Sequence, residues 1–117
     1  MQVRLNNITT GTYNGRNDYN ANAVAGTAVN VTATNFYTTY LNLDASTSAT
    51  LQFNLFDYTN TTSNKQITAQ MQYLSSSNVQ STYLFGACRT TSAIDRITVF
   101  PSAGTFSAGT YILYGGN

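Results

Sequence analysis

Alternation of apolar and polar side chains with a period of two constrains this chain more than any other feature. Residues 66–73 are the clearest case, because Ile67, Ala69, Met71 and Tyr73 alternate with polar Gln and Thr residues. A period of two places one set of side chains on each face of a β-strand. A helix would need apolar residues three and four positions apart, so this window predicts a strand with one buried and one wet face.

Similar short windows recur along the chain, separated by polar or Gly-containing stretches. The expected strands are residues 3–8, 29–31, 35–43, 51–56, 66–73, 83–85, 94–100 and 110–114. Residues 9–27 predict a polar loop, in which Asn14 and Gly15 favour a tight turn. About eight short strands with frequent turns are typical of an all-β, antiparallel β-sandwich with a jelly-roll-like arrangement.

Composition agrees with this fold class and predicts one domain over residues 1–117. Charged residues make up only 8% of the chain, and Glu, a good helix former, is absent. The hydrophobic fraction of 42% and the aromatic fraction of 13% argue against disorder. A chain of 117 residues is long enough to build one core without metals or disulfides.

The residue types that carry most enzyme and metal chemistry are scarce. The chain has no His and no Glu, and nothing in the spacing of its Asp residues suggests a pair of catalytic carboxylates. A single cysteine, Cys88, can form neither an internal disulfide nor a zinc site, and its neighbours predict a buried thiol. Residues 14–20 and 57–60 are faintly calcium-like, but Asx turns are favoured there. We therefore expect neither catalysis nor a cofactor.

Nucleic acid, membranes and glycans are the other partner classes to consider. The five cationic residues are scattered, which argues against nucleic acid, and no apolar run has the length of a membrane span. Tyrosines with neighbouring Asn and Thr could stack on a sugar, although tyrosine is also an ordinary sheet residue. The candidate glycan contacts are Tyr13, Asn17, Tyr19 and Tyr58, and Tyr37 and Tyr40 are further tyrosines of this kind.

An uncharged, strand-rich surface suits packing against other proteins. Lys and Glu are the residues that commonly keep the free edges of sheets apart, and this chain has few charges of any kind. The composition therefore favours a component of an assembly over a freely diffusing monomer.

Two stretches of the second half carry a more specific pattern. They are FDYTNTTSNKQITAQMQYLSSS, residues 56–77, and RTTSAIDRITVFPSAGTFSAGTYILYG, residues 89–115. Together with the opening VRLNNITTGTYNGRNDY, they resemble a β-domain common at the C-terminal ends of tailed-phage virion proteins, typically tail fibres or other minor structural proteins. The positions that carry the resemblance include Asp57, Asn60, Lys65, Arg89, Gly104, Phe106, Gly109 and Tyr114.

The resemblance implies a location and a set of partners. It implies a virion protein, such as a tail fibre, head fibre or capsid decoration protein, held in a homo-oligomer, with a trimer favoured, and in contact with other virion proteins. A carbohydrate-binding module at a fibre tip, which recognises a host surface glycan, is the alternative. The family has one or two strands before the matched opening. This chain is then a shortened relative, a fragment of a longer fibre, or a domain that a neighbouring subunit completes by strand addition.

The pattern of these residues can also be explained by structural needs alone. We expect Asp57 or Asn60 to set an Asx turn, and we expect Pro101 to end a strand, because proline cannot donate to a ladder. Gly104 and Gly109 would let the chain reverse between two closing strands, with Phe106 packed beneath the hairpin as a plug.

Overall fold

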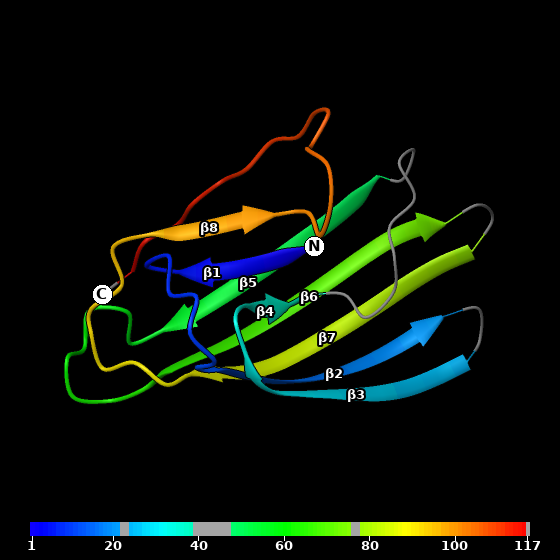
Figure 1. The fold of residues 1–117 in the computed structure, drawn as a ribbon. Coiled ribbons are helices and arrows are strands. Elements are labelled where there is room, and N and C mark those ends of the chain that lie inside the picture. The colour runs from blue at the N-terminus through cyan, green and yellow to red at the C-terminus, as the bar shows by residue number, and fades with distance from the viewer. Residues whose placement is uncertain (22–23, 39–47, 76–77, 117) are drawn as a thin grey trace.

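The structure, a computed structural model, describes residues 1–21, 24–38, 48–75 and 78–116. Within these ranges the chain forms eight strands and no helix (Figure 1). They are β1 (Gln2–Leu5), β2 (Tyr13–Ala21), β3 (Val24–Ala33), β4 (Phe36–Tyr37), β5 (Ala49–Phe56), β6 (Lys65–Ser75), β7 (Asn78–Cys88) and β8 (Ile97–Phe100).

The strands form two antiparallel sheets that lie one over the other. The small sheet has three strands in the order β4-β1-β8, and the large sheet has five strands in the order β3-β2-β7-β6-β5. Figure 1 shows the short strands of the small sheet lying across part of the long strands of the large one. The all-β sandwich expected from the sequence is confirmed. The jelly-roll arrangement is not confirmed by this division into three and five strands.

The core lies between the two sheets, where the alternation of the sequence places the apolar side chains. Ile67 and Ala69 of β6 and Leu84 of β7 face Val3 and Leu5 of β1, and all five are buried. Each large side chain buried in this way contributes roughly 1.5–3 kcal/mol. The same alternation sends the Gln and Thr residues of β6 to the opposite, solvent-facing side of the large sheet.

The expected loop at residues 9–27 is wrong, because β2 and β3 form a long hairpin there. Asn14 and Gly15 do not turn the chain. They lie inside β2, where the register with β3 shifts between Tyr13 and Gly15 as a β-bulge. The Asn14 side chain accepts a hydrogen bond from the Thr32 amide at 2.9 Å. Asn and Gly mark bulges as well as turns, and the sequence alone does not separate the two.

The closing hairpin of the sequence prediction is also wrong in its second half. β8 is present and Pro101 follows it, but residues 101–116, which we call the tail segment, contain no strand. Phe106 is 49% exposed, so it does not pack beneath a hairpin. Gly104 has a φ of 72°, which places the predicted backbone reversal at this glycine. Of the strand expected at 35–43, only Phe36–Tyr37 is seen, and residues 39–47 lie outside the described ranges.

Candidate interaction surface

Three segments that are far apart in sequence meet at one end of the sandwich, the left end in Figure 1. They are residues 5–13, 57–65 and 88–96, and we call them together the bonded end. Polar side chains bind them to one another through backbone groups. The Asn6 side chain donates to the Ala93 carbonyl at 2.8 Å and accepts from the Asp95 and Arg96 amides. The Ile94 amide donates to the Tyr58 carbonyl at 2.7 Å.

The 57–65 part of the bonded end is built on Asn60 and Lys65. The Asn60 side-chain oxygen accepts hydrogen bonds from the Thr62 and Ser63 amides, at 2.7 and 2.9 Å, which is the Asx turn expected from the sequence. The fully buried Lys65 ammonium donates to the Asn60 and Ser63 carbonyls. A lysine ammonium therefore binds the carbonyls of the loop that was faintly calcium-like in sequence.

Arg89 and Asp57 have backbone roles at the same end. The Arg89 guanidinium donates to the Gly11 carbonyl at 2.9 Å, and its amide donates to the Thr12 carbonyl at the same distance. Asp57 has a φ of 51°, in the left-handed region that Asp tolerates better than most residues. The bonded end thus uses its polar side chains to hold loops together.

The candidate glycan contacts are not brought together on one surface. Tyr13 and Asn17 have no exposed area, so neither offers a face to a ligand in this structure. The Tyr13 hydroxyl donates to the Leu5 carbonyl and accepts from the Leu5 amide, and its ring meets Phe36 edge-on at 4.8 Å. Burial raises the pKa of Tyr13 to about 12.

The other tyrosines named in the sequence are separated from these. Tyr58 is half-buried and packs against the core from the bonded end. Tyr19 is half-buried, and an added Cβ at Gly26 would collide with its ring. Tyr37 lies in β4, also half-buried, and Tyr40 lies outside the described residues.

The surface that is available to a partner is instead the outer face of the large sheet. We use this name for the side chains that point away from the small sheet. The cross-strand pairs show how it is composed: Arg16 stands between Val29 and Phe85, and Asp18 between Thr27 and Tyr83. Further pairings extend these rows, Phe85 to Thr68 and Tyr83 to Gln70. This is an open, mostly uncharged face with two aromatic rings near its middle.

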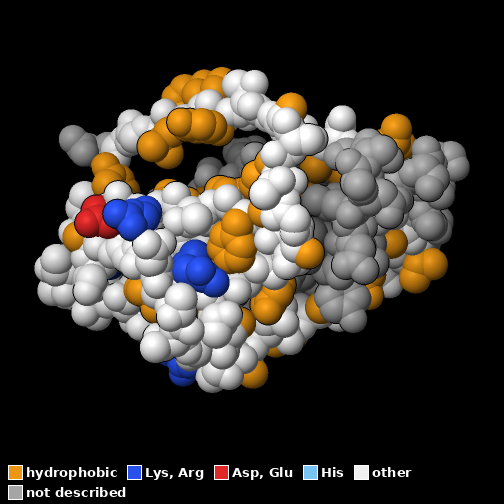
Figure 2. Space-filling view, turned by 45° about the horizontal axis from the view of Figure 1, so that its top comes forward, with side chains coloured by type: hydrophobic (Ala, Val, Ile, Leu, Met, Phe, Trp, Pro, Cys, Tyr) orange, Lys and Arg blue, Asp and Glu red, His pale blue; other side chains and the backbone are white. Residues whose placement is uncertain are grey.

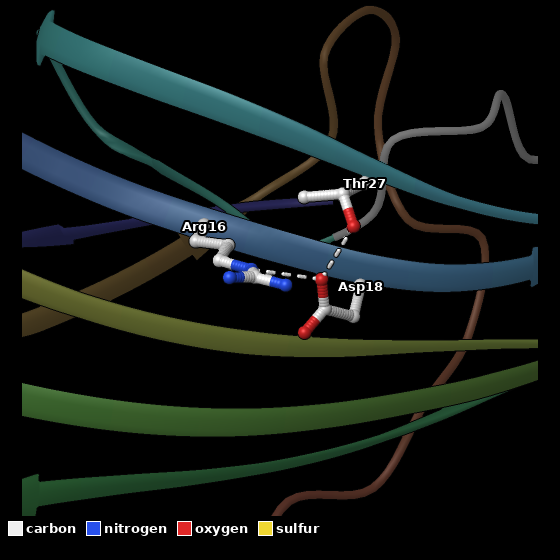
Figure 3. A network of polar contacts seen from close by, with 3 residues as sticks. All are labelled: Arg16, Asp18 and Thr27. Atoms are coloured by element: carbon white, nitrogen blue, oxygen red, sulfur yellow. Dashed lines mark hydrogen bonds and ion pairs between the residues drawn. The ribbon is translucent and has the colours of Figure 1, made fainter.

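A small polar network fixes the charged residues of the outer face (Figure 3). The Arg16 Nε lies 3.0 Å from Asp18 Oδ1, and the Thr27 hydroxyl donates to the same oxygen at 2.8 Å. The hydrogen bond from Thr27, and then that from Arg16, lower the pKa of the Asp18 carboxyl. Within the described residues, Asp18 Oδ2 and the two terminal nitrogens of Arg16 form no further hydrogen bond to the protein. Donors and an acceptor thus remain side by side on this face.

The outer face is shallow, and apolar side chains line part of it. Two depressions, of about 300 and 560 Å³, lie over β2, β3 and β7. Val29 and Val31 are 66% and 67% exposed at the edge, and the residues Tyr83 and Phe85 are 46% and 54% exposed. The sequence analysis missed this face, although the wet Gln and Thr positions of residues 66–73 are part of it. Tyr83 and Phe85 were placed in a strand without a face being assigned.

Three other kinds of site were considered in the described part of the chain: a metal site, a reactive thiol and a membrane-spanning helix. No group of three or more His, Cys, Asp or Glu residues that could hold a metal ion occurs there. Burial raises the pKa of the Cys88 thiol, and the residue is fully buried as expected. Nowhere among the described residues is there a helix with the length and apolarity of a membrane span.

Comparison of the chain with protein-family models, curated proteins and solved structures gave no significant match. The resemblance to the phage virion family therefore stays a prediction.

Proposed function

We propose that this chain is a structural component of a tailed-phage virion, a tail-fibre, head-fibre or decoration protein, that assembles with copies of itself or with other virion proteins. The location in a virion and the preference for a trimer rest on the resemblance of the sequence alone. The tendency to assemble has independent support from the surface.

The observation that carries the proposal is the free edge at β3. This strand is ten residues long and stands at the end of the five-stranded sheet. It contains neither a charged residue nor a proline, and its residues Val24, Val29 and Val31 are each about two-thirds exposed. Exposed edges in soluble proteins are normally protected by lysine, proline or a short strand length. An edge without such protection is expected where a partner covers it.

Sedimentation velocity tests this proposal directly. We expect the full chain to form a defined oligomer at micromolar concentration, and Val31→Lys to weaken the association by placing a charge on the β3 edge. Gln72→Lys is the matched control, because Gln72 is exposed on the outer face but lies on the interior strand β6. The proposal would be contradicted if the chain stays monomeric and if cross-linking of purified phage particles links it to no other virion protein.

Glycan recognition is the second candidate, and the polar network of the outer face favours it. The free Asp18 oxygen and Arg16 nitrogens could bind neighbouring sugar hydroxyls, with the exposed Tyr83 ring as a stacking surface. We expect Tyr83→Ala and Asp18→Asn to abolish any binding on a glycan array, and Val79→Ala, on the same strand, to retain it. An array without binders for the unaltered chain would rule out this candidate.

A further inference from the structure

The tail segment is the least expected feature of the surface. Four consecutive large residues, Tyr111, Ile112, Leu113 and Tyr114, are 92%, 71%, 78% and 85% exposed. Within the described ranges, no residue from 101 to 116 takes part in a hydrogen bond. Figure 2 shows the segment as an arch that stands away from the body, with hydrophobic side chains along it. A contiguous apolar stretch of this kind marks an interaction site.

The sequence of the segment is that of a strand without a partner. Tyr, Ile and Thr fit a pleated strand, and residues 110–114 contain no charge, Gly or Pro. All four large side chains are apolar, so both faces of such a strand would need cover. A Cβ added at Gly109, Gly115 or Gly116 would meet nothing within 4 Å, so the backbone on both sides of the segment is also uncovered.

The small sheet has a strand edge to which such a strand could pair. β8 is the end strand in the order β4-β1-β8, and among the described strands it pairs only with β1. Its residues Ile97 and Val99 pair with the buried Leu5 and Val3 and so face the same side, yet they are 38% and 42% exposed. They are exposed although they lie on the core side, because no strand of the described chain covers the far side of β8.

We infer that residues 110–114 of one copy pair as a strand with the free edge of β8 in a second copy of this chain. This inference deepens the proposed function, on which it rests, by naming a second copy as the partner and by adding a contact surface separate from the β3 edge. The lengths agree, since β8 has four residues and the donated stretch has five, and neither carries a charge. Such pairing gives main-chain hydrogen bonds to both strands and covers the apolar side chains of both.

The choice of a second copy over the chain's own β8 follows from the course of the segment. The hairpin predicted from the sequence would pair residues 94–100 with 110–114 of the same chain. In the structure residues 101–109 lead away from the end of β8 and the backbone reverses at Gly104, and the rest of the tail segment runs back toward the bonded end (Figure 1) without forming a strand or a hydrogen bond with β8. When a complementary pair of elements is held apart within one chain, exchange between identical copies satisfies both at low cost.

Cross-linking of two variants, each with one added cysteine, tests the inference. Thr98→Cys places a thiol in the middle of β8, and Ile112→Cys places one in the middle of the donated strand, while the native Cys88 is buried. After mixing the two variants with different tags and oxidising them, we expect a disulfide between differently tagged chains. If a double variant links only within one chain and the mixture gives no link, the inference is overturned in favour of closure on the own β8.

The second part of the test introduces negative charges into the donated strand. Ile112→Asp with Leu113→Asp should raise the dissociation constant of the oligomer by roughly a hundredfold, because two apolar contacts become buried charges. Ser102→Asp with Ser107→Asp is the matched control, with the same added charge on the same arch but outside the donated strand. Association that survives the first double variant unchanged would overturn this inference and leave the proposed function standing. A full chain that is monomeric throughout would overturn both.

Discussion

The bonded end and the tail segment differ in composition and have opposite structures. The bonded end is rich in Thr and Asn and holds five of the nine charged residues of the chain, whereas the tail segment is rich in Gly and contains neither a charged residue nor Asn. In the bonded end, side chains such as Asn6, Asn60 and Lys65 each bind two or more backbone groups. In the tail segment, the large side chains from Tyr111 to Tyr114 are exposed and find no partner among the described residues of their own chain. The comparison teaches that the first region stabilises the single chain and that the second is available to another molecule.

The largest effect in this comparison is expected at Tyr13. Its ring fills the core beside Phe36, and its hydroxyl binds both backbone groups of Leu5. Tyr13→Ala should lower the free energy of unfolding by about 4 kcal/mol, as for other large-to-small changes in a core. Tyr13→Phe keeps the ring and should cost about 1.5 kcal/mol for the lost hydrogen bonds. Urea unfolding of both variants measures the difference, and equal effects would show that the ring is not the important part.

Lys65 tests the polar half of the bonded end. Lys65→Met keeps most of the buried aliphatic stem and removes the ammonium that binds the Asn60 and Ser63 carbonyls. We expect a loss of about 3 kcal/mol, because the carbonyls of a closed loop lose a charged donor. Lys65→Arg serves as a control that retains the charge. A methionine variant as stable as the original would mean that water satisfies these carbonyls without cost.

Alkaline pH provides a third test, with a sign that follows from the raised pKa of Tyr13. The folded-state pKa of about 12 lies above the ordinary tyrosine value of 10.0, so the neutral phenol is favoured in the folded state. The contribution to stability is fully present below pH 10 and is lost as the pH rises toward 12. Roughly 2 kcal/mol should disappear in this window. Unfolding of Tyr13→Phe over the same range is the control, and an equally steep loss there would assign the effect to other groups.

The strands of the large sheet show which parts of the fold can be predicted from the sequence and which cannot. Residues 66–73 were assigned correctly, because Ile67 and Met71 face the core while the Gln residues face solvent. β2 was missed, because its inward positions include Gly15 and the polar Asn17, so its alternation is not one of hydrophobicity. Its pairing with β7 supplies the missing information, and this depends on residues 59 to 75 positions away, from the pair Ala21 and Gln80 to the pair Tyr13 and Cys88.

The candidate glycan contacts do not lie on one exposed surface, for a related reason. Tyr13 and Tyr19 are six positions apart on one strand and share a face, and the sequence does not say whether the core takes that face. The structure buries Tyr13 and exposes Arg16 and Asp18, while Tyr83 arrives beside Asp18 from β7. Such cross-strand neighbours are created by register, which is set between segments. The Asx turn at Asn60 could be predicted from the sequence, because its hydrogen bonds join residues only two or three positions apart.

The smallest effect on the single chain is expected in the tail segment, and it completes the comparison. Tyr111→Ser with Leu113→Ser should change the free energy of unfolding of the monomer by less than about 0.5 kcal/mol, as for other exposed sites without partners. Measured at a dilution where any oligomer has dissociated, this small change would contrast with the large ones at Tyr13 and Lys65. The same variant should be less stable than the unaltered chain at high concentration, because binding of a second copy stabilises the folded unaltered chain by mass action. A loss of monomer stability comparable to that of Lys65→Met would show instead that the tail segment packs on its own chain, and the two regions would then no longer differ in kind.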